Sequence, residues 1–275
     1  MPELPEVETV RRTLQPHLAG RTIAGVHVGV YQRCVATPEV DEFRERLIKS
    51  QISGVGRRGK FILLHLSTGD VVTIHLRMTG EVSIIDPVVP ADVHVHLWLD
   101  LENGKQVRYR DVRKFGRWSL LTGNQYAIFD QSIGPEPLEP ELTSEQFTTM
   151  LQGRKRILKP LLLDQQFLAG VGNIYADEAL YRAGIHPRRR SCDLAADECE
   201  RLLAEIRLVL SSALEHRGTT LRDYRDGNGE PGENLSRLQI YSRSADDPCH
   251  RCGTPIVREL IGQRGTKICP TCQPI

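Results

Sequence analysis

The chain has 275 residues, of which 40% are hydrophobic and 26% are charged. These proportions are typical of a globular protein and exclude a disordered or fibrous chain, and the length allows two domains that each bury a core. No run of residues is apolar over the length of a membrane span. The first residues are acidic where a signal peptide would be basic and apolar, so a cytoplasmic protein is expected. Because the net charge is only +1, any nucleic-acid surface must be a local basic patch.

The N-terminal segment MPELPEVETV predicts the start of a helix. Pro5 fits the first helical position, and Glu6 and Glu8 place negative charge in the first turn, where it stabilises the helix dipole. This interpretation leaves Pro2 and Glu3 unexplained.

Residues from about 22 to 122 predict mostly β-strands. Apolar runs flank a Ser-Thr-Gly-Asp segment at 67–70, and a second pair of runs flanks Asn103-Gly104; both are hairpin signals. One further helix is expected at roughly 38–50, because a proline followed by acidic residues opens it. The first domain is therefore predicted to be a β-sandwich or barrel with flanking helices.

The segment GPEPLEP at 134–140 is dense in proline and predicts a domain boundary. Beyond it the apolar period becomes helical, with helices expected from 144, from 157, at 173–184 and at 195–215. Residues 218–236 are rich in glycine and poor in apolar side chains, which predicts a mobile loop that can order over a ligand.

Four of the seven cysteines form the pattern C-x2-C-x16-C-x2-C, at Cys249, Cys252, Cys269 and Cys272. Two close pairs at this separation are typical of a zinc ribbon, and four thiolates leave no position open for water, so a structural zinc ion is expected. The alternative is two chance pairs or a redox dithiol.

Two basic segments and one glycine turn in the second half of the chain are candidates for binding a nucleic-acid backbone. Arg264 belongs to a short basic hairpin between the second and third cysteines of the motif. Lys155 belongs to the basic segment GRKRILKP at 153–160. Asn173 is expected to cap the helix that follows the turn LAGVG, where exposed backbone N–H groups can bind a phosphate. Each of these segments is either a grip on a nucleic-acid backbone or an ordinary solvated turn or capped helix.

Met78, Arg113 and Phe115 follow predicted strands in the first domain. Methionine and phenylalanine are usually core residues, but at loop tips beside arginine they can act as wedges that enter a base stack. Lys60, in RRGKFILL, lies at a strand entry, where a solvated lysine is the ordinary alternative.

One chemistry explains Pro2 and Glu3. If Met1 is removed, Pro2 becomes a secondary amine that can attack the anomeric carbon of a sugar and give an iminium intermediate. The adjacent helix N-terminus disfavours the protonated amine, and Glu3 is placed to move protons for the opening sugar.

Together these segments resemble the bacterial formamidopyrimidine-DNA glycosylase family. The motifs that carry the resemblance span the chain: MPELPEVETVRR, RRGKFILL, HLRMTG, RYRDVRKFGRW, GPEPL, LLLDQQFLAGVGNIYADEALYRAGIHP, HRGTTLRDY and CHRCGTPIVREL with QRGTKICPTC. The related endonuclease VIII typically has PEGPE at its start, whereas this chain has PELPE, which favours the branch that acts on guanine lesions.

The resemblance implies an α+β multidomain fold with one structural Zn2+. Its domains would be an N-terminal β-sandwich catalytic domain at 1–135, a helix-two-turns-helix DNA-binding domain at 136–242 and a four-cysteine zinc finger at 243–275. The implied activity is that of a bifunctional base excision repair enzyme, which excises oxidised purines such as 8-oxoguanine and formamidopyrimidines and nicks the strand by β,δ-elimination. The implied partner is double-stranded DNA containing an oxidised base or an abasic site, bound by a monomer.

The catalytic roles of the family fall on four matching positions. Pro2 would be the Schiff-base nucleophile and Glu3 the proton donor, while Lys60 and Arg264 would be donors for β-elimination and δ-elimination. Glu6 is expected to share in the site. The family's DNA contacts, its void-filling set and its helix-two-turns-helix asparagine fall on His94, Arg113, Lys155, Met78, Phe115 and Asn173. The loop at 218–236 corresponds to the lesion-capping loop of the family.

Two other functions remain open from the sequence. An enzyme of the endonuclease VIII type would prefer oxidised pyrimidines, and a non-catalytic zinc-dependent DNA-binding protein would keep the fold without the chemistry. A retained Met1 would favour the non-catalytic protein, because a blocked Pro2 cannot react.

Overall fold

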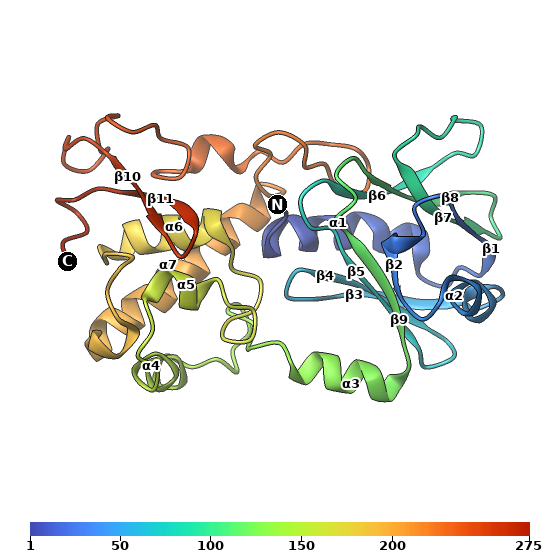
Figure 1. Ribbon diagram of the computed structural model, residues 1–275, viewed down its shortest axis with the longest axis horizontal. Coiled ribbons are helices and arrows are strands. Elements are labelled where there is room, and N and C mark those ends of the chain that lie inside the picture. Colours follow the sequence, from blue (N-terminus) through green and yellow to red (C-terminus); the bar gives the residue numbers. More distant parts are fainter. The chain divides into compact units, whose positions relative to one another are not determined.

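The computed structural model describes all residues from 1 to 275, and they form two compact units (Figure 1). The first unit contains Met1–Ser132 and His216–Glu233, and the second contains Ile133–Glu215 and Asn234–Ile275. The structure therefore assigns residues 216–233 to the first unit, although they follow the proline-rich boundary in sequence. The division into three domains at 135 and 242 stays a prediction. None of the helices is both long and apolar enough to span a membrane.

Two β-sheets form the body of the first unit. The five-stranded sheet has the order β2 (Val35–Thr37), β9 (Arg117–Leu121), β5 (Val71–His75), β4 (Phe61–Leu66) and β3 (Ile52–Arg58). The four-stranded sheet has the order β1 (Ile23–Val28), β7 (Val95–Leu101), β8 (Gln106–Asp111) and β6 (Gly80–Ile85). One hydrophobic core contains buried side chains from both sheets, so the predicted β-sandwich is confirmed.

The two predicted hairpins are present. Leu64 in β4 pairs with Val72 in β5 across the 67–70 turn, and Leu99 in β7 pairs with Val107 in β8 across Asn103-Gly104. Gly104 has a φ of +79°, a backbone conformation that favours glycine at this position of a tight turn. Local turn chemistry was thus enough to locate both connections.

Three helices flank the sandwich. Helix α1 (Leu4–Leu18) begins one residue before Pro5, and Glu3 is its N-cap. Helix α2 (Val40–Leu47) is shorter than the 38–50 expected, because Glu39 and Ile48 have ψ angles of 153° and 131°, which are not helical. Helix α3 (Gly123–Gln131) was not predicted, although Thr122 accepts a hydrogen bond from the Gln125 N–H as a standard helix cap.

The second unit is mainly helical, as expected, with a two-stranded hairpin near its end (Figure 1). Its helices are α4 (Ser144–Gln152), α5 (Leu158–Leu162), α6 (Asn173–Ala183) and α7 (Ala196–Glu215), and its strands are β10 (Val257–Ile261) and β11 (Arg264–Ile268). Three 3-10 turns complete the chain: η1 (Gln32–Cys34) in the first unit, and η2 (Ser191–Asp193) and η3 (Asn234–Arg237) in the second. Apolar side chains of α6 and α7 are buried where the two helices pack together.

The glycine-rich segment 216–233 lies against α1. Gly227 N–H donates to the Thr13 hydroxyl at 2.9 Å, and the Gly227 carbonyl accepts from the N–H of Ile84 in β6 at 3.4 Å. Tyr224 packs partly buried against the core of the sandwich. These contacts place the segment against α1 and β6, and the mobility expected for residues 218–236 stays a prediction.

Candidate functional site

The N-terminal residues are held at the start of α1. Pro2 and Glu3 are both buried, and Glu3 is only 2% exposed. The Glu3 N–H donates to Glu6 Oε2 at 2.7 Å, which satisfies one of the backbone donors that a helix start leaves unpaired. Met1 is 45% exposed and therefore accessible at the chain end.

Glu6 also connects α1 to the 216–233 segment. Its Oε1 accepts from the Thr219 N–H at 2.7 Å, and its backbone carbonyl accepts from the Tyr224 hydroxyl at 3.2 Å. Burial, together with the Glu6 charge, raises the pKa of Tyr224 far above its usual range, so this hydroxyl stays a donor. Sequence reasoning missed Thr219 and Tyr224, because their partners lie more than 200 residues earlier in the chain.

Lys60 lies in the turn between β3 and β4 and is only 4% exposed. The alternative of a solvated lysine is therefore wrong. His75, paired with Phe61 in the next strand, lies within electrostatic range of Lys60. Burial, and then the charges of Arg77 and Lys60, lower the pKa of His75 to about 3, so this ring is neutral beside the lysine.

Met78 and Phe115 are not core residues. Their side chains are 42% and 47% exposed, in the turns that follow β5 and β8 respectively. The guanidinium of Arg113 lies over the Phe115 ring at 4.9 Å, within the range of a cation–π contact. Two apolar tips and a cation are thus presented at the surface, which agrees with the wedge interpretation; their role in DNA stays a prediction.

His94 lies just before β7, and its carbonyl accepts from the Asp111 N–H at 2.9 Å. Asp111 is the last residue of β8 and precedes the turn that carries Arg113 and Phe115. The structure therefore brings the His94 backbone next to the turn that carries two other residues expected to contact DNA.

In the second unit, the structure brings Asn173 and the Arg264 hairpin together. The N-cap of α6 is Gly172, so the predicted capping role of Asn173 is wrong. The Asn173 side chain instead donates to the Gly265 carbonyl at 3.2 Å, next to the exposed Arg264. Lys155 is exposed before α5 and has no contact with this hairpin among the hydrogen bonds and ion pairs of the unit.

A buried ion pair lies under the same hairpin. Lys159 Nζ lies 2.6 Å from Asp177 Oδ1, both side chains are at most 1% exposed, and Lys159 also donates to the Thr266 hydroxyl at 2.7 Å. Burial raises the pKa of Asp177 to about 6, although the Lys159 charge opposes the shift. No sequence pattern predicted this pair, because Lys159 follows other basic residues in GRKRILKP and resembles one more solvated lysine.

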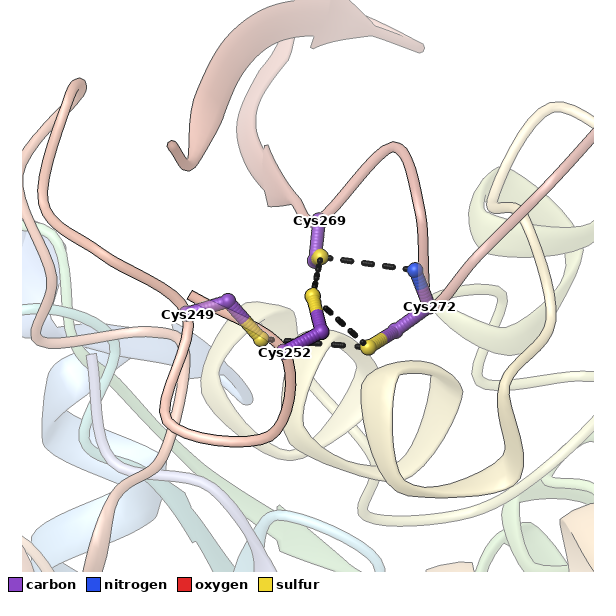
Figure 2. Close-up of side chains that lie close together, drawn as sticks. All are labelled: Cys249, Cys252, Cys269 and Cys272. Atoms are coloured by element: carbon purple, nitrogen blue, oxygen red, sulfur yellow. Dashed lines mark hydrogen bonds between the residues drawn. The ribbon is translucent and has the colours of Figure 1, made fainter. Parts of the chain in front are cut away.

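The four terminal cysteines converge on one point, and Figure 2 shows their sulfur atoms turned toward one another. All four Sγ atoms lie within 4.8 Å of one another. The Cys249–Cys272 and Cys252–Cys269 sulfur separations are 3.8 and 3.5 Å. A tetrahedral zinc ion with Zn–S bonds of about 2.3 Å needs S···S edges of about 3.8 Å, so these residues fit zinc.

The surroundings of the cysteines also suit thiolate ligands. The Tyr181 hydroxyl lies 3.0 Å from Cys249 Sγ, and the Arg251 and Cys272 N–H groups donate to Cys249 and Cys269 sulfurs at 3.4 Å. Such outer contacts orient metal ligands and disperse their charge. One zinc ion held by four sulfurs stabilises the hairpin and leaves no position for a reacting water.

Three family models match the chain along its length. Residues 1–118 match the formamidopyrimidine-DNA glycosylase N-terminal domain, and residues 133–225 match its H2TH domain. Residues 246–275 match the zinc finger found in FPG and IleRS. The sandwich, the helical part and the cysteine cluster each correspond to one of these models.

Whole-chain similarities agree. The formamidopyrimidine-DNA glycosylases of Herpetosiphon aurantiacus and Roseiflexus sp. are 46% and 47% identical, each over 99% of this chain and 100% of the relative. A Lactococcus lactis FPG variant in complex with Fapy-dG-containing DNA superposes with a TM-score of 0.93 at 34% identity, covering 100% of both chains. The Lactococcus lactis enzyme with abasic-site DNA gives a TM-score of 0.91 at 34% identity, over 99% and 100% of the two chains. The chain therefore belongs to the formamidopyrimidine-DNA glycosylase family of DNA-repair enzymes.

Proposed function

We propose that this enzyme excises oxidised purines, such as 8-oxoguanine and formamidopyrimidines, and then cleaves the strand by β,δ-elimination with Pro2 as nucleophile. The observation that carries the proposal is the fixed N-terminus: Pro2 is buried at the start of α1, next to Glu3 and the hydrogen-bonded Glu6. Removal of the exposed Met1 would convert Pro2 into a secondary amine held in place by the helix.

The proposed chemistry proceeds through an iminium. The Pro2 nitrogen bonds to C1′ of the lesion nucleotide as the glycosidic bond breaks; the base leaves with its electron pair and gains a proton, and the nitrogen loses its own. Glu3 delivers a proton to the sugar ring oxygen as the ring opens, which gives the iminium between nitrogen and C1′. Loss of a C2′ proton to water then breaks the C3′–O bond and expels the 3′ phosphate, with Lys60 as the donor. Loss of a C4′ proton to water breaks the C5′–O bond and expels the 5′ phosphate, with Arg264 as the donor. Glu6 acts as a positioning residue, because it holds the Glu3 and Thr219 backbone.

The proposed partner is duplex DNA that contains an oxidised base or an abasic site, bound by one copy of the chain. The solved relatives are described in complex with Fapy-dG, abasic-site and carbocyclic 8-oxo-G DNA. Met78, Arg113 and Phe115 would fill the space left by an extruded base, a step that costs a few kcal/mol. Residues that would contact the DNA backbone are His94, Lys155, Asn173 and Arg264.

Borohydride trapping tests the nucleophile. Wild-type enzyme with 8-oxoguanine duplex should give a covalent adduct after reduction, and Pro2→Gly should trap far less. Intact-mass analysis of the same sample should show loss of Met1. An adduct that forms equally well with Pro2→Gly would refute the assignment.

A paired excision assay tests the lesion class. Duplexes containing 8-oxoguanine or thymine glycol are cut side by side, and the purine lesion should be excised faster. Faster excision of thymine glycol would favour an enzyme of the endonuclease VIII type. DNA binding without excision of either base or nicking of an abasic site would favour the non-catalytic alternative.

A further inference from the structure

Asp111 has hydrogen-bonding partners on both turns that carry the exposed wedge side chains. Its side chain is fully buried, and hydroxyl and backbone N–H groups donate to both of its oxygens. Oδ1 accepts from the Thr79 hydroxyl at 2.5 Å, and Oδ2 accepts from the Tyr109 hydroxyl at 2.9 Å and the Gly116 N–H at 2.8 Å. A buried carboxylate is stable when such donors satisfy its oxygens.

Thr79 joins the two turns directly. It follows Met78, and its hydroxyl donates to Asp111 while accepting from the Arg113 N–H at 3.1 Å. The Arg113 N–H is shared with Asp111 Oδ1 at 3.2 Å. One hydroxyl therefore connects the turn that carries Met78 to the turn that carries Arg113.

We propose that Asp111 and Thr79 lock the Met78 turn and the Arg113–Phe115 turn into one rigid wedge, and that this lock is needed for base extrusion. The inference rests on the proposed function, in which these exposed side chains enter the base stack. Asp111 and Thr79 are positioning residues in this proposal, because they act only through the turns that they hold.

The local backbone explains why a lock is needed. Arg77 and Lys114 have φ angles of +56° and +60°, a region that residues other than glycine rarely adopt. A Cβ on Gly116 would overlap the Tyr109 hydroxyl, so the second turn passes close to the residue that Asp111 holds. Turns with such conformations persist only where surrounding contacts determine them.

Rigidity matters because a wedge must displace stacked bases. Side chains that are already ordered lose little conformational freedom when DNA binds, whereas two loose turns must be ordered at that step. The lock should therefore contribute to base extrusion and much less to the chemistry at Pro2, which an abasic-site duplex reports without any base to extrude.

The test uses Thr79→Val, which has nearly the same shape but lacks the hydroxyl, and Thr79→Ser, which restores it. The full-length enzyme is assayed on an 8-oxoguanine duplex and on an abasic-site duplex. Thr79→Val should lose about tenfold or more in excision, as expected for the loss of a buried hydrogen-bonding group, while nicking of the abasic duplex changes less. Thr79→Ser should recover excision.

A second readout does not depend on excision. The fluorescence of 2-aminopurine placed opposite the lesion rises when the pair is opened, and Thr79→Val should reduce this rise. If the wild type opened the pair but excised no base, the proposed function would be wrong. The difference in 2-aminopurine fluorescence between wild type and Thr79→Val would still test whether Thr79 is needed for base extrusion. Tryptophan fluorescence reports folding, because both tryptophans, Trp98 and Trp118, lie in the first unit.

Three results would overturn the lock. The first is excision and pair opening by Thr79→Val at the wild-type level. The second is an equal loss of activity on both duplexes, and the third is a loss that Thr79→Ser does not restore.

Asp111→Asn provides an independent variant, because an amide nitrogen cannot accept a hydrogen bond from the fixed N–H of Gly116 or Arg113. It should reproduce the selective loss on the lesion duplex, and normal excision with normal pair opening by Asp111→Asn would also contradict the proposal.

Discussion

In each unit a turn that is expected to contact DNA lies next to a buried carboxylate, but the groups that neutralise the two carboxylates differ. In the first unit, Asp111 is surrounded by hydroxyl and backbone donors. In the second, Asp177 forms a buried ion pair with Lys159, which also donates to the hairpin next to Arg264. The strands of this hairpin, β10 and β11, lie between the two cysteine pairs of the cluster.

The two carboxylates differ in pKa accordingly. Burial opposes ionisation of Asp111, but hydrogen bonds from Thr79, Gly116 and Tyr109 lower its pKa overall. Burial of Asp177 is not fully offset by Lys159, so its pKa is raised to about 6. The donors around Asp111 therefore outweigh the effect of burial on its pKa, whereas Lys159 and the Lys267 N–H do not outweigh it at Asp177.

Metal removal should give the largest difference between the units. A structural zinc site contributes on the order of 10 kcal/mol to folding, so chelation or Cys269→Ser should unfold the hairpin and abolish DNA binding and strand nicking. The tryptophan fluorescence of the first unit should change little. Released zinc, measured with a chromogenic chelator, should be one ion per chain. DNA binding and nicking that survive zinc removal would contradict the structural role of the metal.

Lys159→Met should give the next largest effect. The substitution leaves the Asp177 carboxylate buried without its cation, which typically costs about 3 to 5 kcal/mol. Urea unfolding followed by far-UV circular dichroism would measure this loss, because the second unit is mainly helical. Lys159→Met combined with Asp177→Leu should recover most of the stability.

An exposed ion pair in the same unit provides the control. Asp197 lies 3.6 Å from Arg201 and is 77% exposed, so Asp197→Asn should change the free energy of unfolding by about 0 to 1 kcal/mol. If Lys159→Met cost no more than Asp197→Asn, the buried pair would not be what supports the hairpin.

Acid should destabilise the first unit through His75, with a smaller effect. Its pKa is about 3 in the folded protein and about 6.5 when unfolded, so the unfolded chain binds the extra proton first as the pH falls. This contribution is complete about one unit above pH 6.5 and should have fallen by about 2 kcal/mol at pH 5.

The variant His75→Asn distinguishes the titration of His75 from that of other groups in the first unit. Asparagine keeps an acceptor for the Arg77 N–H, which His75 Nδ1 accepts at 2.9 Å, but it does not titrate. Urea unfolding followed by tryptophan fluorescence should therefore show a shallower pH dependence in the variant. Equal slopes in both proteins would exclude His75 as the source.

The sequence predicted features whose causes are local. Alternating residues and turn signals located the hairpins, and the cysteine spacing located the metal site, because each depends on neighbours in the chain. Pro2, Glu3 and Lys60 came from chemistry and resemblance, and their catalytic roles stay predictions.

Other features depend on distant partners and gave no such signal. Asn173 was predicted to cap a helix, but its side-chain amide donates a hydrogen bond to the Gly265 carbonyl, 92 residues away. Tyr224 lies in a glycine-rich segment, and only the fold reveals that it packs on α1. No role was predicted for Asp111, although it precedes Arg113 and Phe115, because its partner Thr79 lies 32 residues earlier in the chain.

The return of residues 216–233 to the first unit limits how this enzyme can be divided. The chain passes between the units at 132/133, 215/216 and 233/234. A fragment ending at residue 132 would lack Thr219 and Tyr224, and Glu6 would lose a donor beside the N-terminus. Gene fusions or split versions that cut at the proline-rich segment would therefore separate the N-terminal residues from part of their own support.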